Sequence, residues 1–148
     1  MNKRIFSFTD GASRGNPGHS SGGVLLTDES GKILFEGGIY LDKGTNNEAE
    51  YRALLFGLEK AADLKAQEIV CHLDSELVVK QLSGLYRLKS PRMIEFHRQV
   101  RERLARFKSA SFVHLPREHP NMRVADRLAN KTLNETLKKH PHQNTGGQ

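Results

Sequence analysis

Residues 4–18 read RIFSFTDGASRGNPG, and this stretch decides the fold class. The aromatic and β-branched side chains of residues 4–9 are typical of a strand, which we expect to stop at an Asp-Gly turn pair before a glycine-rich loop. The period of two along a strand places Asp10 on the same face as Phe6 and Phe8. A buried ionised carboxylate is costly unless it is paired or binds a metal ion. Asp10 is therefore a candidate functional residue.

The strands and helices expected after this stretch follow an order that predicts the architecture. Strands are expected at 22–27 and 33–41, joined by the turn Asp28-Glu29-Ser30-Gly31-Lys32, and a bulge is expected at Gly37-Gly38. Beyond them we expect a helix at 48–64, a strand at 69–73, helices at 76–83 and 91–106, a strand at 110–115 and a helix at 120–138. A hairpin-led start followed by strands and helices in alternation predicts an α/β fold with a five-stranded mixed sheet covered by helices.

Length and composition exclude several classes of protein. The 148 residues predict one domain, which we place at 1–139, followed by a flexible tail at 140–148 that lacks large apolar residues. No apolar run approaches the length of a membrane span. The single Cys71 excludes an intramolecular disulfide framework and a cysteine-rich zinc site. Without an apolar signal core near the N-terminus, the expected location is cytoplasmic.

Three further acidic residues lie where a purely structural chain would favour apolar side chains. Glu50 precedes Leu54 by four residues and so shares the buried stripe of its helix. Asp74 ends the fourth strand, where α/β sheets present ligand groups. Asp126 follows Met122 by four residues on the apolar face of the last helix.

Each acid also has a structural interpretation. Asp10 could be a turn residue, Glu50 could favour the helix dipole, Asp74 could cap a helix, and Asp126 could pair with Arg123 or Arg127. Four such coincidences in one chain are improbable. Carboxylates are ligands that Mg²⁺ prefers, and two such ions can clamp an in-line phosphoryl displacement. The net charge of +6, from 23 Lys and Arg against 17 Asp and Glu, favours a polyanionic substrate such as nucleic acid.

The motifs resemble those of type 1 ribonuclease H, in its compact prokaryotic branch. They are Phe8-Thr9-Asp10-Gly11, Gly15-Asn16-Pro17-Gly18, Thr45-Asn46-Asn47 with Glu50, Leu73-Asp74-Ser75 and Ala125-Asp126. The resemblance covers about residues 4–135. It implies a ribonuclease H-like fold with strand order 3-2-1-4-5. It also implies hydrolysis of the RNA strand of RNA/DNA hybrids by two Mg²⁺ ions, with Mn²⁺ as an alternative, leaving 5′-phosphate and 3′-hydroxyl ends.

The resemblance also implies a role for each acid. Asp10 would bridge both metal ions, Asp126 would help hold the ion that activates the water, and Glu50 and Asp74 would hold the ion at the leaving 3′ oxygen. Glu50 is favoured over Glu48 by its spacing, because Glu48 is expected on the outer face of the helix, paired with Arg52.

Substrate contacts are implied for the residues beside these acids, namely Gly11, Ser13, Gly15, Asn16, Thr45, Asn46 and Asn47. Glycines let a backbone approach the RNA minor groove, where the 2′-hydroxyl distinguishes RNA from DNA. Thr45 and Asn47 would hold a DNA phosphate. The alternatives are a turn that needs positive φ for the glycines and helix capping for Thr45 and Asn47.

One catalytic feature of the family departs from its usual pattern. Better-studied members carry a histidine in a mobile loop shortly before the last acid, whereas Pro116 stands at the expected position here. His119 is the candidate for this auxiliary role, with Glu118 as a rival, and a cap residue is the alternative for His119. The chain has no Trp, so the basic, aromatic-rich protrusion of some members is expected to be reduced or absent.

The basic excess is concentrated in one segment. Residues 87–108 hold eight basic and two acidic side chains, a difference equal to the whole net charge. This segment is a candidate phosphate-facing surface, and the alternative is a solvated face with Arg98–Glu102–Arg106 pairs. We expect an RNA/DNA hybrid as the partner, no membrane, no obligate protein partner, and a monomer.

Three other functions compete with this interpretation. A hybrid-binding module without catalysis predicts the loss of at least one acid, and none of the four is missing. An integrase or junction resolvase would not explain the GNPG loop and the Thr-Asn-Asn motif together. A nucleotide phosphotransferase is disfavoured because no G-x-x-x-x-G-K-[ST] motif occurs.

Overall fold

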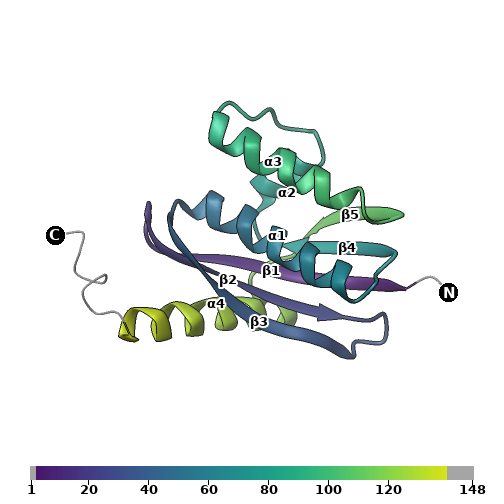
Figure 1. The fold of residues 1–148 in the computed structure, drawn as a ribbon, viewed down its shortest axis with the longest axis horizontal. Coiled ribbons are helices and arrows are strands. Elements are labelled where there is room, and N and C mark those ends of the chain that lie inside the picture. The colour runs from purple at the N-terminus through teal and green to yellow at the C-terminus, as the bar shows by residue number, and fades with distance from the viewer. Residues whose placement is uncertain (1–2, 140–148) are drawn as a thin grey trace.

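The computed structural model describes residues 3–139, which form one sheet with helices on both faces (Figure 1). The elements are β1 (Arg4–Gly15), β2 (Gly18–Thr27), β3 (Ile33–Gly44), α1 (Asn46–Asp63), β4 (Glu68–Leu73), α2 (Glu76–Leu82), α3 (Pro91–Leu104), β5 (Ser109–His114) and α4 (Pro120–Lys139). The sheet order is β3-β2-β1-β4-β5, which confirms the expected five-stranded topology. The tail expected at 140–148 lies outside the described residues.

Strand direction changes at the centre of the sheet. β1 pairs antiparallel with β2, and β2 pairs antiparallel with β3. β1 and β4, and then β4 and β5, run parallel, and the chain enters β4 and β5 from the helices α1 and α3. β1 is therefore the central strand, and any residue at its middle lies close to both halves of the sheet.

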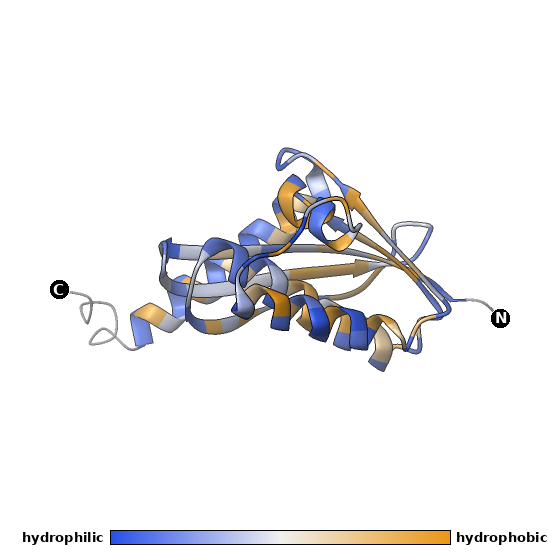
Figure 2. Ribbon diagram, turned by 90° about the horizontal axis from the view of Figure 1, so that it is seen from above, coloured by the Kyte–Doolittle hydropathy of each residue, from blue (hydrophilic) through white to orange (hydrophobic). Residues whose placement is uncertain are grey.

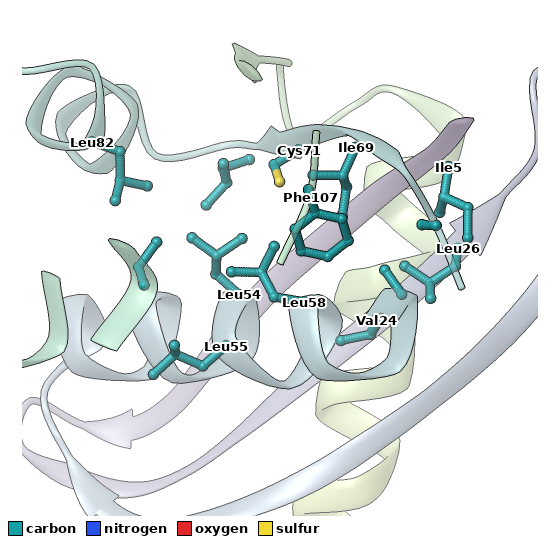
Figure 3. Close-up of a cluster of buried hydrophobic side chains, with 14 of the residues drawn as sticks. Ile5, Val24, Leu26, Leu54, Leu55, Leu58, Ile69, Cys71, Leu82 and Phe107 are labelled. Atoms are coloured by element: carbon teal, nitrogen blue, oxygen red, sulfur yellow. The ribbon is translucent and has the colours of Figure 1, made fainter. Parts of the chain in front are cut away.

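Helices cover the two faces unequally. α1 packs on β1, β2 and β3 from one side and carries α3 on its outer surface, whereas α4 packs on the same three strands from the other side (Figure 1). Apolar residues gather along the strands, and polar residues colour the outward surfaces of the helices (Figure 2). The main core lies between α1 and the sheet, where Leu54, Leu58 and Ile69 are almost completely buried (Figure 3). No helix among residues 3–139 is both long and apolar enough to cross a membrane.

The first strand is longer than its sequence suggests, and the expected stop at the Asp-Gly pair is wrong. Pairing with β2 continues from Asp10, opposite Gly23, to Gly15, opposite Gly18. The chain reverses only after Gly15, which has a φ of 97°, a conformation that suits glycine. Cross-strand hydrogen bonds thus override the local turn preference, and Asp10 sits within a rigid central strand.

The bulge expected at Gly37-Gly38 is also wrong. Pairing with β2 runs without a shift there, and the irregularities lie between Ser20 and Ser21 and between Leu26 and Thr27. Glycine serves a different purpose on this face. A Cβ at Gly38 would lie 2.1 Å from the Thr132 Oγ1, and one at Gly23 would lie 1.9 Å from the Ala125 carbonyl oxygen. The missing side chains let α4 approach the sheet closely, and α4 carries Asp126.

Helix α1 begins at a capping box. The Thr45 hydroxyl accepts a hydrogen bond from the Glu48 backbone N–H, and the Glu48 carboxylate accepts one from the Thr45 N–H. The expectation that Glu48 faces outward and pairs with Arg52 is therefore wrong: Glu48 is buried and forms its ion pair with Arg92. Arg52 donates instead to the Leu41 carbonyl.

Candidate active site

Three of the four candidate acids converge from three different elements. Asp10 comes from the middle of β1, Glu50 from the first turns of α1, and Asp74 from the residue that follows β4. One carboxylate oxygen from each lies within 4.8 Å of those of the other two. Asp10 and Glu50 are only 3% and 8% exposed, so two of these acids are buried.

Glu50 is held at one oxygen and free at the other. Its Oε1 accepts a hydrogen bond of 2.8 Å from the Gly11 backbone N–H, whereas its buried Oε2 has no hydrogen-bond partner. Gly11 makes this contact feasible, because a Cβ there would lie 2.5 Å from the Ala49 carbonyl carbon. The close approach of β1 and α1 thus leaves a buried carboxylate oxygen of Glu50 unsatisfied, and a bound cation would satisfy it.

The protonation equilibria of the cluster are strongly perturbed. Burial raises the pKa of Asp10, and the negative charges of Glu50 and Asp74 raise it further. Burial followed by the charge of Asp74 also raises the pKa of Glu50, although a side-chain interaction with Asp10, then the Gly11 N–H and the charge of Arg117, oppose this shift. Like charges in a poorly solvated site disfavour ionisation. A divalent cation would reverse both effects.

Asp126 lies on the wall of a cavity of about 580 Å³ that Glu50 and Asp74 also line. Its side chain is the last and smallest of the causes that raise the pKa of Asp10. Its oxygens are not part of the tight three-acid group. The Asn130 side chain, one helical turn further along α4, donates to the Asp126 Oδ1 at 3.1 Å. The fourth acid therefore borders the cluster rather than joining it.

Two functional candidates on this cavity wall were missed from the sequence, Arg117 and Asn130. The Arg117 Nε lies 3.5 Å from the Asp74 Oδ2 and belongs to the loop between β5 and α4. No local pattern indicates this contact, since the two residues are 43 positions apart. Asn130 was detectable, because a residue four positions after Asp126 lies on the same helix face.

Most of the expected substrate residues lie around this cavity and the next one. Gly11, Ser13, Asn46 and Asn47 line the cavity that holds the acids. Asn16, Thr45, Asn46 and Asn47 line a neighbouring cavity of about 380 Å³ together with Met93. The Asn16 Oδ1 accepts from the Asn46 N–H at 3.0 Å, which joins the β1–β2 turn to the start of α1. Gly15 lies in that turn and lines neither cavity.

The structure places His119 at the start of α4. Its Nδ1 lies 3.2 Å from the Asn121 backbone N–H, which donates to it, and its ring stacks on Phe8 with the centroids 6.2 Å apart. These contacts match the cap alternative. Neither His119 nor the exposed Glu118 lines the cavity of the acids. The auxiliary catalytic role of either residue stays a prediction.

Part of the basic segment is neutralised by neighbouring acids. Arg98 contacts both Glu95 and Glu102, Arg103 contacts Glu59, and Arg92 contacts Glu48. Among the described residues, Arg87, Lys89, Arg101, Arg106 and Lys108 of this segment make no ion pair. The expected helix-surface pairing thus applies to Arg98 but not to Arg106, and the unpaired cations remain available to a polyanion.

The mixed sheet and the carboxylates that converge on Asp10 of its central strand define a protein with the ribonuclease H fold. A family model described as reverse transcriptase-like matches residues 8–132, and the chain belongs to that family. Similarity to a known ribonuclease HI and to solved RNase H1 structures likewise confirms the resemblance to type 1 ribonuclease H.

The chain is 42% identical over 132 residues to ribonuclease HI of Halobacterium salinarum, covering 89% of this chain and 65% of that protein. It is 38% identical over 125 residues to the bifunctional protein Rv2228c of Mycobacterium tuberculosis, covering 84% of this chain and 34% of that protein. The chain thus spans less than two thirds of the length of either relative.

Solved structures agree with these sequence comparisons. The crystal structure of RNase H1 from Halobacterium salinarum superposes with a TM-score of 0.86 at 41% identity, covering 89% of this chain and 98% of that chain. LC11-RNase H1 in complex with an RNA/DNA hybrid superposes with a TM-score of 0.84 at 38% identity, covering 90% of this chain and 99% of that chain.

Proposed function

We propose that this protein is an endoribonuclease that hydrolyses the RNA strand of RNA/DNA hybrids and leaves 5′-phosphate and 3′-hydroxyl ends. The observation that carries the proposal is the convergence of Asp10, Glu50 and Asp74 within 4.8 Å, with one Glu50 oxygen buried and unpartnered. Membership of the reverse transcriptase-like family and the hybrid-bound LC11-RNase H1 support the substrate class. We assign the activity to residues 1–139.

The residues present fit a pair of Mg²⁺ ions, with Mn²⁺ as an alternative. The donors are carboxylate oxygens, which hard divalent cations prefer, and the cluster has more negative charge than its burial tolerates. Asp10 would be shared between the ions, Asp126 would hold one of them, and Glu50 and Asp74 would hold the other. When bound, such ions lower the pKa of a water and neutralise the attacking and leaving oxygens of an in-line displacement.

The protein's own groups would position the hybrid over this cluster. Gly11 and Ser13 line the cavity beside the acids, so the backbone of β1 can approach the RNA minor groove and its 2′-hydroxyls. Asn16 and Asn46, joined by their hydrogen bond, border the second cavity, where a phosphate of the DNA strand would bind. Thr45 caps α1 and thereby holds Asn46 and Asn47 at that border.

The remaining cations would strengthen this binding without adding sequence information. The unpaired basic side chains of residues 87–108 lie within or beside α3, and cations that contact phosphates add sequence-independent, salt-dependent affinity. The full proposal is an Mg²⁺-dependent monomer that acts in the cytoplasm.

The decisive experiment compares cleavage of three labelled duplexes. RNA/DNA hybrid, duplex RNA and duplex DNA of one sequence are incubated with the protein in Mg²⁺ and in excess chelator. We expect cleavage of the hybrid RNA strand in Mg²⁺ only, with products that a 5′-phosphate-dependent exonuclease degrades. Hybrid cleavage that survives chelation, or equal cleavage of duplex DNA, would refute the proposal.

A further inference from the structure

A chain of polar contacts leads from the surface residue Arg14 to the carboxylate of Asp126. The Arg14 Nη2 donates to the Asn134 Oδ1 at 2.5 Å and, in a longer hydrogen bond, to the Asn130 Oδ1 at 3.5 Å. The Asn130 Nδ2 in turn donates to the Asp126 Oδ1 at 3.1 Å and to the Asp126 carbonyl at 3.0 Å. These contacts connect β1 with two turns of α4.

The partners of Asn130 permit only one orientation of its amide. An arginine side chain can only donate hydrogen bonds, and an ionised carboxylate can only accept them. The amide oxygen must therefore face Arg14 and the amide nitrogen must face Asp126. The opposite orientation would place donor against donor and oxygen against oxygen, so Arg14 keeps the Asn130 donor directed at Asp126.

Three of the four acids each have a distinct neighbouring group that holds or contacts them. The Gly11 N–H holds Glu50, Arg117 contacts Asp74, and Asn130 holds Asp126. Asp126 is half-buried and borders the tight cluster, so its carboxylate depends on a neighbour for its orientation. A hydrogen bond to one oxygen leaves the other available, and such outer contacts tune metal ligands in general.

We propose that Asn130 is the positioning residue for Asp126 and that Arg14 fixes the orientation of its amide. The inference rests on the proposed function, because it assigns Asp126 to a divalent ion. In this arrangement neither residue would itself be a ligand of the ion. Both act through the orientation of Asp126.

Metal binding without nucleic acid tests this inference directly, since Arg14 lies next to residues expected to contact the hybrid. Free Mn²⁺ is measured by electron paramagnetic resonance during titration of the full chain. We expect Asn130→Ala to weaken binding at the Asp126 position by about tenfold or more. Arg14→Ala should cause a smaller loss, about two- to fivefold, because it acts through Asn130.

The double variant with both Arg14→Ala and Asn130→Ala distinguishes an effect of Arg14 that passes through Asn130, which we call the relay, from two independent effects. If Arg14 acts through Asn130, Arg14→Ala adds nothing once Asn130 is alanine, and the two losses do not multiply. Lys131→Gln, an exposed change on the same helix, is the matched control and should bind Mn²⁺ like the wild type. Thermal unfolding followed by circular dichroism checks that every variant is folded.

The outcomes distinguish this inference from the proposed function. Unchanged Mn²⁺ affinity in either single variant, or losses that multiply, would overturn the relay even if the wild type cleaves hybrid. A wild type that binds no Mn²⁺ and cleaves no hybrid would overturn both. Weakened binding in folded variants with non-multiplying losses, in a wild type that cleaves hybrid, supports both.

Discussion

The Nε of Arg117 lies 3.5 Å from the Oδ2 of Asp74, so an exposed guanidinium reaches an acid that is only 12% exposed. The charge of Asp74, followed by that of Asp10, raises the pKa of Arg117, and the charge of Arg117 in turn lowers the pKa of Glu50. Arg117 therefore offsets part of the negative charge of the cluster, and a divalent cation would take over this role.

Replacing the positively charged Arg117 should destabilise the metal-free protein. We expect Arg117→Gln to lower the free energy of unfolding in chelator by about 0.5–1 kcal/mol, a modest value because Arg117 is mostly exposed. Saturating Mg²⁺ should remove most of the difference, and urea unfolding under both conditions measures it. Arg106→Gln, an exposed arginine without an ion pair among the described residues, is the control. Equal losses for the two variants in chelator would contradict the prediction.

Neutralising Asp10 should separate catalysis from binding. Asp10→Asn removes the carboxylate that neighbours Glu50, Asp74 and Asp126, so turnover of hybrid should fall by at least about a hundredfold. Hybrid affinity, measured by fluorescence anisotropy, should stay within about threefold, because the phosphate contacts that dominate affinity lie elsewhere. Near-normal turnover would refute the role of Asp10 as a shared metal ligand.

The metal-free protein should lose stability as pH rises. The pKa values of Asp10 and Glu50 are higher in the folded protein than in the unfolded chain. At a pH between the unfolded and the folded pKa of either group, the folded state therefore binds more protons than the unfolded state. Stability then falls with increasing pH, starting near the ordinary carboxyl pKa of about 4. Urea unfolding at pH 5 and pH 8 in chelator should show the decrease.

The same measurement has an internal control. Asp10→Asn should be more stable than the wild type at pH 8 in chelator, by roughly 1–3 kcal/mol, because folding then no longer requires a proton on a carboxyl that is ionised in the unfolded chain. The gap should narrow at pH 5. A wild type whose stability rises between pH 5 and pH 8 in chelator would show that the cluster does not control it.

A methyl group at Gly23 should disturb the site through packing. The added Cβ of Gly23→Ala would lie 1.9 Å from the Ala125 carbonyl oxygen, so α4 must move away from the sheet. We expect a loss of about 1–3 kcal/mol in unfolding free energy, with reduced hybrid cleavage because Asp126 moves with the helix. Gly44→Ala, whose nearest neighbour would be at 3.6 Å, is the control and should change both much less.

Much of the fold and the site could be predicted from local patterns. Periodicity and cap residues located the helices to within two residues, and Thr45 indeed caps α1. The position of Asp10 in line with Phe6 and Phe8 identified a carboxylate on a buried strand face. These signals succeed because each depends on residues that are close in the sequence, where helix and strand geometry determine which side chains share a face.

Local patterns failed where contacts between segments that are distant in the sequence determine the structure. The Asp10-Gly11 pair reads as a turn, yet pairing with β2 extends the strand through it. Glu48 is predicted to lie on the outer face of its helix, yet it is buried and forms an ion pair with Arg92 of α3. Gly38 is predicted to lie in a bulge, yet its role is in packing, because the missing side chain lets α4 lie close to the sheet.

The sequence by itself determined the order of strands and helices and the placement of four acids on buried faces and strand ends, because these follow from short-range geometry. Only the tertiary structure decided which groups hold those acids. Arg117 meets Asp74 across 43 positions, and Arg14 meets Asn130 across 116, through crossovers and packing that no local period encodes. The tight grouping of three acids, with Asp126 beside it, is likewise a product of how α1 and α4 pack on β1.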